Sequence, residues 1–238
     1  MEKKAKKLSG GFLTNPIYVQ IIYPLLLWLT RQRDSVSRAD RMSINGGIIL
    51  YSAIFLEGFL EDILCTFISN YADSAGGKTA ALTDIEKTSS LQGYKALFRG
   101  FGLQLGDFLN GGEQEDLDFI FRYRNLLAHG QRDSYIIYHG EDFRPTGIAG
   151  SVYADIEKFL IKRRVLKKKG SVQPNHTELF SDKVADWVFA QTTAIVGRMF
   201  KVLEQRLPYY QMSQQANVFR LSQLMQVIGA RATQEPQK

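Results

Sequence analysis

The sequence predicts an all-α protein. Apolar side chains recur every three or four residues along most of the chain, as they do on one face of an α-helix. Helix-breaking residues, such as Asn110-Gly111-Gly112 and Pro208, stand where these periodic segments end. Only residues 135–144 have a strand-like composition, and they are too few for more than a hairpin or an ordered loop. We therefore expect a helical bundle with extra helices and one short hairpin or loop insertion.

Composition divides the chain into three regions. Residues 1–12 are basic and lack apolar periodicity, so we expect a flexible arm. Residues 13–208 carry the helical domain, and residues 209–238 hold one more helix and a frayed tail. The formal net charge of +6 is concentrated in the arm and in residues 162–169. Such clustering favours a phosphate-rich or anionic partner, although a solvated tail and a solvated helix end would have the same composition.

The first two helices are predicted from their boundary residues and their apolar faces. The first should start at Asn15-Pro16, run to about Arg33 and kink near Pro24, which has no backbone donor. The second should run from about Ser43 to Tyr71. Because it is apolar on nearly every side, we expect it to be the central helix.

The remaining helices follow a loop at residues 73–90, which has room for a short helical piece and ends in a cap at Ser89 or Ser90. A third helix should cover 91–108, although three glycines weaken its continuity. A fourth should cover 113–130, with acidic residues in its first turn and a terminal glycine. Further helices are expected at residues 152–168, 177–207 and 213–228.

Several classes of protein are disfavoured. Cys65 is the only cysteine, so an internal disulfide is impossible and a reducing, cytoplasmic setting is expected. The apolar run at 17–29 is shorter than the roughly 20 residues of a membrane span, so we expect no membrane insertion. His139 and His176 are isolated from acidic or thiol ligands, and nucleotide-binding glycine motifs are absent. Neither a metal nor a cofactor is therefore expected.

Arg124 interrupts an apolar stripe of the fourth helix. At 100° per residue it lies close to Leu117 and Ile120 on one face. A cation there needs a carboxylate partner, a cleft or a subunit contact, because burying it unpaired would cost several kcal/mol. Glu57 and Glu61, one turn apart on the central helix, are the candidate partners. The plainer alternative is that Arg124 makes a core ion pair and nothing else.

A second stripe of the same helix is polar and contains Asp118, Arg122, Asn125 and His129. A solvated face would have the same composition. On an ideal helix His129 lies about 140° from Arg124, so the two side chains cannot easily address one phosphate within one straight helix. Either the helix end unwinds at Gly130, or two chains pair and bring one chain's histidine opposite the other's arginine.

The string Arg-Tyr-Arg-Asn-Leu-Leu-Ala-His-Gly, residues 122–130, resembles the R-x(4–6)-H signature of the HEPN domain family. Residues 56–64, Leu-Glu-Gly-Phe-Leu-Glu-Asp-Ile-Leu, are similar to that family's long early helix with an embedded acid. The resemblance covers about residues 43–205. It implies a HEPN-like bundle that cleaves RNA without metal at a composite site in a homodimer.

The chemistry of the residues agrees with this implication. His129 can exchange protons with a ribose 2′-hydroxyl or a leaving oxygen near neutral pH, and Arg124 can bind the phosphate as its charge grows. Asn125 could orient the imidazole or hold a phosphate oxygen. Arg122, seven positions before His129, is the second choice for the catalytic arginine.

A basic cluster follows the hairpin region and could grip the RNA backbone, or could be a solvated helix end. Its members are Lys162, Arg163, Arg164, Lys167, Lys168 and Lys169.

Three functional hypotheses follow. The leading one is a metal-independent endoribonuclease of a toxin–antitoxin or phage-defence system, with an antitoxin or defence-complex protein as a further partner. The alternative is a non-catalytic HEPN module that binds RNA or a partner protein. The third is a structural helical scaffold within a larger defence complex.

Overall fold

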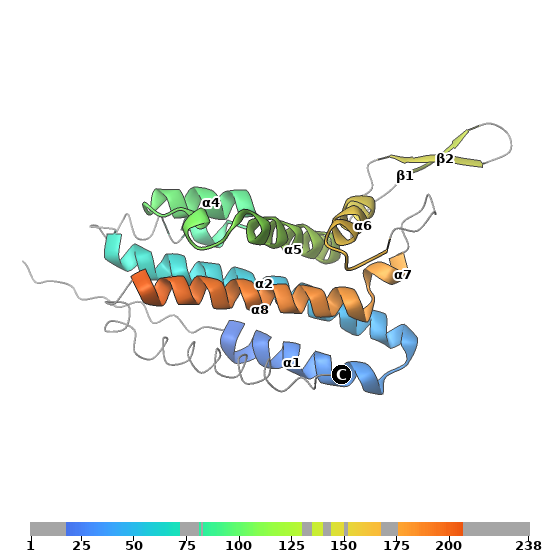
Figure 1. Cartoon of the computed structure of the whole chain (residues 1–238), viewed down its shortest axis with the longest axis horizontal. Helices are drawn as coiled ribbons and strands as arrows, with labels where there is room; N and C mark the ends of the chain where they lie inside the picture. Colours follow the sequence, from blue (N-terminus) through green and yellow to red (C-terminus); the bar gives the residue numbers. More distant parts are fainter. Residues whose placement is uncertain are drawn as a thin grey trace, which may run out of the picture.

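The computed structural model describes residues 18–71, 81, 83–129, 135–139, 144–149, 152–167 and 176–206. The expected arm at residues 1–12, the helix expected at 213–228, and two members of the basic cluster, Lys168 and Lys169, lie outside the described residues. Within the described part the architecture is helical, with one antiparallel hairpin (Figure 1). The expectation of an all-α fold is confirmed at this level.

The chain enters the described fold through a π-helical turn, η1 (Tyr18–Ile22), that continues directly into α1 (Tyr23–Gln32) and the 3-10 turn η2 (Arg33–Ser35). Pro24 lies in the first turn of α1. Because proline cannot donate a backbone hydrogen bond, the wider π turn before it is a natural adjustment. The α-helix ends at Gln32, close to the predicted end at about Arg33, and the predicted start at Asn15-Pro16 lies outside the described residues.

The longest helix, α2 (Arg38–Tyr71), is the centre of the molecule. It packs against α1, α5 and α8, and Figure 1 shows it between the α1 layer and the α4–α5 layer. Side chains such as Phe55 and Phe59 are almost fully buried, which confirms the predicted central position. The helix starts earlier than Ser43. Ser37 accepts a hydrogen bond from the backbone N–H of Asp40 (3.3 Å), and its hydroxyl donates to the Asp40 carboxylate (2.7 Å).

The predicted third helix is too long at its C-terminal end. The structure has α4 (Leu91–Gly100), capped by Ser90, whose hydroxyl accepts from the Gly93 N–H at 3.2 Å. Gly102 then adopts a φ of +71°, and the Leu103 N–H bonds back to the carbonyl of Phe98 at 2.8 Å. This is a Schellman-type stop, which glycine tolerates because it has no Cβ.

The helix that carries the motif, α5 (Gly111–His129), follows the short 3-10 turn η3 (Leu105–Asp107). Its start is fixed by a reciprocal capping box: the Asn110 side chain accepts from the Glu113 N–H at 2.9 Å, and the Glu113 carboxylate accepts from the Asn110 N–H at 2.8 Å. The predicted acidic first turn therefore also has a capping role.

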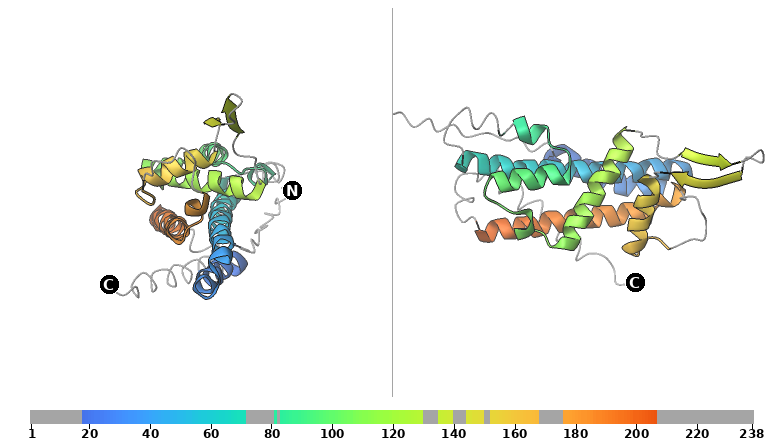
Figure 2. Two further views of the ribbon diagram at one scale, coloured as in Figure 1. Left: turned by 90° about the vertical axis from the view of Figure 1, so that its right-hand side faces the viewer. Right: turned by 90° about the horizontal axis from the view of Figure 1, so that it is seen from above.

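The expected hairpin is present. Strands β1 (Tyr135–His139) and β2 (Arg144–Ala149) pair antiparallel, with an irregularity between Ile137 and Tyr138, and project away from the helices (Figures 1 and 2). The chain then forms α6 (Val152–Lys162), the short α7 (His176–Leu179) and the long α8 (Asp182–Arg206).

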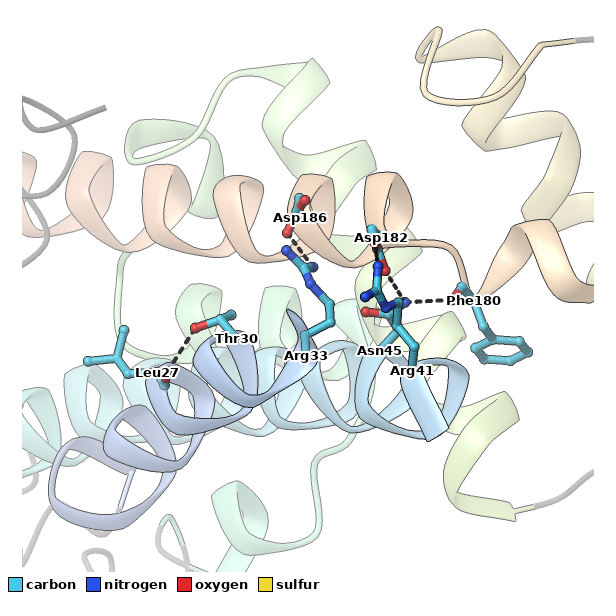
Figure 3. A network of polar contacts seen from close by, with 8 residues as sticks. All are labelled: Leu27, Thr30, Arg33, Arg41, Asn45, Phe180, Asp182 and Asp186. Carbon is cyan, nitrogen blue, oxygen red and sulfur yellow. Dashed lines mark hydrogen bonds and ion pairs between the residues drawn. The ribbon is translucent and has the colours of Figure 1, made fainter. Parts of the chain in front are cut away.

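A polar network joins the start of α8 to η2 and α2 (Figure 3). The buried Asn45 amide donates to the Phe180 carbonyl at 2.8 Å and to Asp182 at 2.9 Å. Arg41 pairs with Asp182 at 3.2 Å, and Arg33 pairs with Asp186 at 2.6 Å. Burial alone would raise the pKa of Asp182, but the Asn45 hydrogen bond and the two arginines hold it below its usual range. The network fixes where α8 begins along α2.

Among the described residues, no helix combines the length and apolar character needed to cross a membrane.

Candidate functional site

The helix α5 crosses over α2 and brings the motif close to the central helix (Figure 2). Leu117, Ile120 and Phe121 are at most 2% exposed, so the predicted apolar stripe faces the core. Ala128, which an ideal helix would place on the same stripe one turn after Arg124, is exposed. Arg124 therefore stands near the place where this stripe leaves the core.

Arg124 forms the ion pair that its position demanded. Its guanidinium donates to the carboxylate of Glu57 on α2 and, at 3.3 Å, to the backbone carbonyl of Ser89. The Arg124 and Glu57 side chains are only 13% and 15% exposed. Of the two carboxylates that the sequence offered, Glu57 is the direct partner.

Glu61, one turn along α2, has a different partner. The hydroxyl of Tyr94 on α4 donates to it at 3.4 Å, a long contact, and the Tyr94 ring is completely buried. We call Glu57, Glu61, Tyr94 and Arg124 the acid–arginine cluster. No sequence feature singled out Tyr94 as a site residue, and none could indicate the Ser89 carbonyl, because every residue has a main-chain carbonyl.

Burial controls the electrostatics of the acid–arginine cluster. It raises the pKa of Glu57 to about 7, against the lowering effect of Arg124, and the nearby charge of Glu61 adds to the rise. Burial also raises the pKa of Glu61, although the Tyr94 hydroxyl works against it. A carboxyl group that titrates near neutral pH beside a mostly buried arginine is typical of functional sites and also of structural ion pairs.

The predicted polar stripe is only partly described. Arg122 makes an exposed ion pair with Asp118 at 3.1 Å on the same helix, and Asn125 is half-buried. His129 is the last residue of α5, but its side chain lies outside the described residues, as do the side chains of His139 and His176. The structure therefore brings Arg124 and Glu57 together and leaves the predicted arginine–histidine relation untested.

The basic cluster divides into two parts. Lys162 and Arg163 pair with Glu115 at 2.8 and 3.2 Å, and Arg163 also forms an ion pair with Asp116 at 2.7 Å. These contacts tie the end of α6 to the first turns of α5. Arg164 and Lys167 are exposed, and Arg164 has the left-handed φ of 61°.

The thiol of Cys65 has no features of a nucleophile. Burial raises its pKa to about 11, and the negative charge of Asp62 and the neighbouring acids adds to the rise. A thiol with such a pKa is almost entirely protonated at neutral pH, as expected of a structural cysteine. Within the part of the chain that the structure describes, no three His, Cys, Asp or Glu side chains gather as a candidate metal site.

Comparison with known protein families, with curated proteins and with solved structures finds no match to this chain.

Proposed function

We propose that this chain is a metal-independent endoribonuclease of the HEPN type, acting at a composite site in a homodimer. One observation supports the composite arrangement most directly: α5 stays helical through His129. On a regular helix the positions of Arg124 and His129 are about 140° apart around the helix axis. Of the two arrangements considered from the sequence, unwinding of the helix end and pairing of two chains, this observation favours pairing.

In the proposed reaction, His129 removes the proton from a ribose 2′-hydroxyl. The 2′-oxygen attacks the adjacent phosphorus, the bond to the 5′-oxygen breaks, and the leaving 5′-oxygen takes a proton from a protonated histidine or from water, which completes the 5′-hydroxyl. The products are a 2′,3′-cyclic phosphate and a 5′-hydroxyl end. Arg124 stabilises the negative charge that builds on the phosphate oxygens, and Asn125 orients the imidazole or holds a phosphate oxygen.

The exposed part of the basic cluster is the better candidate for RNA contact. Arg164 and Lys167 are exposed, whereas Lys162 and Arg163 already have carboxylate partners on α5. A phosphate contact by either of the latter two would have to replace an existing ion pair. We expect Arg164 and Lys167 to contribute more to the salt dependence of RNA binding. Each phosphate contact that is lost should reduce the slope of the logarithm of the binding constant against the logarithm of the salt concentration by about 0.7 to 0.9.

A second candidate function is a non-catalytic HEPN module that binds RNA or a partner protein. The mostly buried pairing of Arg124 with Glu57 favours it, because such a pair also explains the arginine structurally. In either case the proposed setting is a toxin–antitoxin or phage-defence system with a protein inhibitor or complex partner.

Incubation of purified protein with total RNA in EDTA, followed by sequencing of the new RNA ends, separates the two candidates. We expect wild type to generate ends with 2′,3′-cyclic phosphate, and His129→Ala to bind RNA without cutting it. RNA with 2′-O-methyl at the cleaved nucleotide should resist. Binding without cleavage by wild type would support the non-catalytic module, and cleavage that needs added magnesium would contradict the proposed chemistry.

A further inference from the structure

We propose that Tyr94 is a positioning residue for Arg124, acting through Glu61, and that the turn carrying Ser89 is the second support of the guanidinium. This inference rests on the proposed role of Arg124 in phosphate binding. It extends the site from the α2–α5 pair to a third element, α4, together with the turn that precedes it.

The turn before α4 is held from both sides. The Thr88 hydroxyl donates to the Asp84 carbonyl at 2.8 Å, and the Thr88 N–H bonds to the Ile85 carbonyl at 2.9 Å. A Cβ on Gly93 would come within 2.7 Å of the Thr88 side chain, so only glycine lets the turn pack this closely on α4. The Ser89 carbonyl is therefore fixed where it accepts the hydrogen bond from Arg124.

Tyr94 contacts both helices that build the ion pair. Its ring packs against Phe121 of α5, with ring centroids 5.7 Å apart, and Phe121 is one turn before Arg124. Its hydroxyl donates to Glu61 of α2, one turn from Glu57. Removing this hydroxyl can therefore alter the ionisation of Glu61, and through it that of Glu57, the partner of Arg124. The apolar packing of the ring is preserved.

The charged and titratable side chains around these carboxylates come from four elements. Glu57, Glu61, Asp62 and Cys65 lie on α2, Glu86 on the short helical turn before α4, Tyr94 on α4 and Arg124 on α5. Arg124 and Glu61 thus both act on Glu57, the carboxylate that holds the guanidinium. A hydrogen bond from Tyr94 favours the ionised form of Glu61, and the Glu61 charge in turn weakens the ionisation of Glu57.

The test is Tyr94→Phe, followed by carbon-13 NMR titration of the Glu57 and Glu61 carboxyl groups. Loss of the hydroxyl should raise the apparent pKa of Glu61 and lower that of Glu57, each by about 0.3 to 1 unit for one hydrogen bond. A more fully ionised Glu57 should hold the Arg124 guanidinium more tightly and leave it less available to the phosphate. With RNA as substrate, kcat should therefore fall by about 2- to 10-fold while KM changes less than about two-fold. Glu61→Gln removes the charge at the other end of the Tyr94 contact, and it should also lower the pKa of Glu57.

Tyr123→Phe is the matched control. Tyr123 is another fully buried tyrosine, but its hydroxyl donates to the Leu179 carbonyl at 2.5 Å. This variant should lose stability without opposite shifts of the two carboxyl groups. Unchanged titrations in Tyr94→Phe, or the same changes in Tyr123→Phe, would overturn the positioning role. If wild type does not cleave RNA, the proposed function fails, whereas the NMR titration still decides the link from Tyr94 to the ion pair.

Discussion

Replacing Arg124 by alanine should lower the free energy of unfolding, and the size of the loss should depend on how deeply its ion pair with Glu57 is buried. Removing one partner of a fully buried pair costs about 3 to 5 kcal/mol, whereas an exposed pair contributes less than about 1 kcal/mol. Arg124 and Glu57 are 13% and 15% exposed, which is close to the buried limit. We expect a loss of about 2 to 3 kcal/mol of unfolding free energy at pH 8.5, or a fall in Tm of about 4 to 12 °C.

The loss should depend on pH. In wild type the pKa of Glu57 is raised to about 7 although Arg124 lowers it, so removing the arginine should raise that pKa further. Below pH 7 the carboxyl group is mostly protonated in both proteins, and the stability difference should be small. Above pH 7 wild type releases the proton while the variant keeps it, so the difference grows by at most about 1.4 kcal/mol per pH unit.

Urea denaturation at pH 6 and pH 8.5 measures this effect, with Arg122→Ala as the control. Arg122 is on the same helix, but the side chains of its pair with Asp118 are 52% and 43% exposed. That variant should lose less than about 0.5 kcal/mol at either pH. If Arg124→Ala costs no more than Arg122→Ala at pH 8.5, the pair does not stabilise the fold and the reasoning from burial is wrong.

Three other predictions concern the fold. Arg164→Gly should raise the unfolding free energy by about 0.5 to 1 kcal/mol, because glycine relieves the left-handed φ of 61°; a loss of stability in thermal melts would count against this. Asn45→Ala should cost about 2 kcal/mol in urea, since the buried amide donates to both Phe180 and Asp182; a cost below about 0.5 kcal/mol would remove it as an anchor of α8. The pKa of Glu57 is about 7 in the folded protein, against an ordinary value of 4.5. Its contribution to stability should therefore be fully present below pH 4.5 and be lost as pH rises through 7. When the free energy of unfolding is measured from pH 4.5 to 8, Glu57→Gln should lack this loss.

Much of the fold was predictable because helix periodicity and helix ends have local signals. The central position of α2 follows from its apolar circumference, and the capping serine of α4 and the acidic start of α5 were identified from the sequence. The start of α2 was missed, since Ser37-Arg38-Ala39-Asp40 is a short polar cap outside the apolar pattern. The end of α4 was placed too late because Phe101 and Phe108 continue a helical spacing across the stop at Gly102.

The site was predictable only where charge demanded a partner. Burial of Arg124 required a carboxylate, but Glu57 and Glu61 are one turn apart, and the choice depends on how α5 crosses α2. That crossing is a property of tertiary packing. Similarly, Lys162 and Arg163 looked like free cations because their partner Glu115 is more than 40 residues away in the sequence.

Subunit mixing tests the proposed composite ribonuclease site most directly. Arg124→Ala and His129→Ala homodimers should each be inactive in EDTA, and each should sediment near twice the 27.0 kDa chain mass. If one chain's arginine works with the other chain's histidine, refolding the two variants together in equal amounts should restore about a quarter of wild-type cleavage, since half of the dimers regain one of two sites. No restored cleavage, from a mixture shown by mass to contain the mixed dimer, would contradict a site shared between two chains.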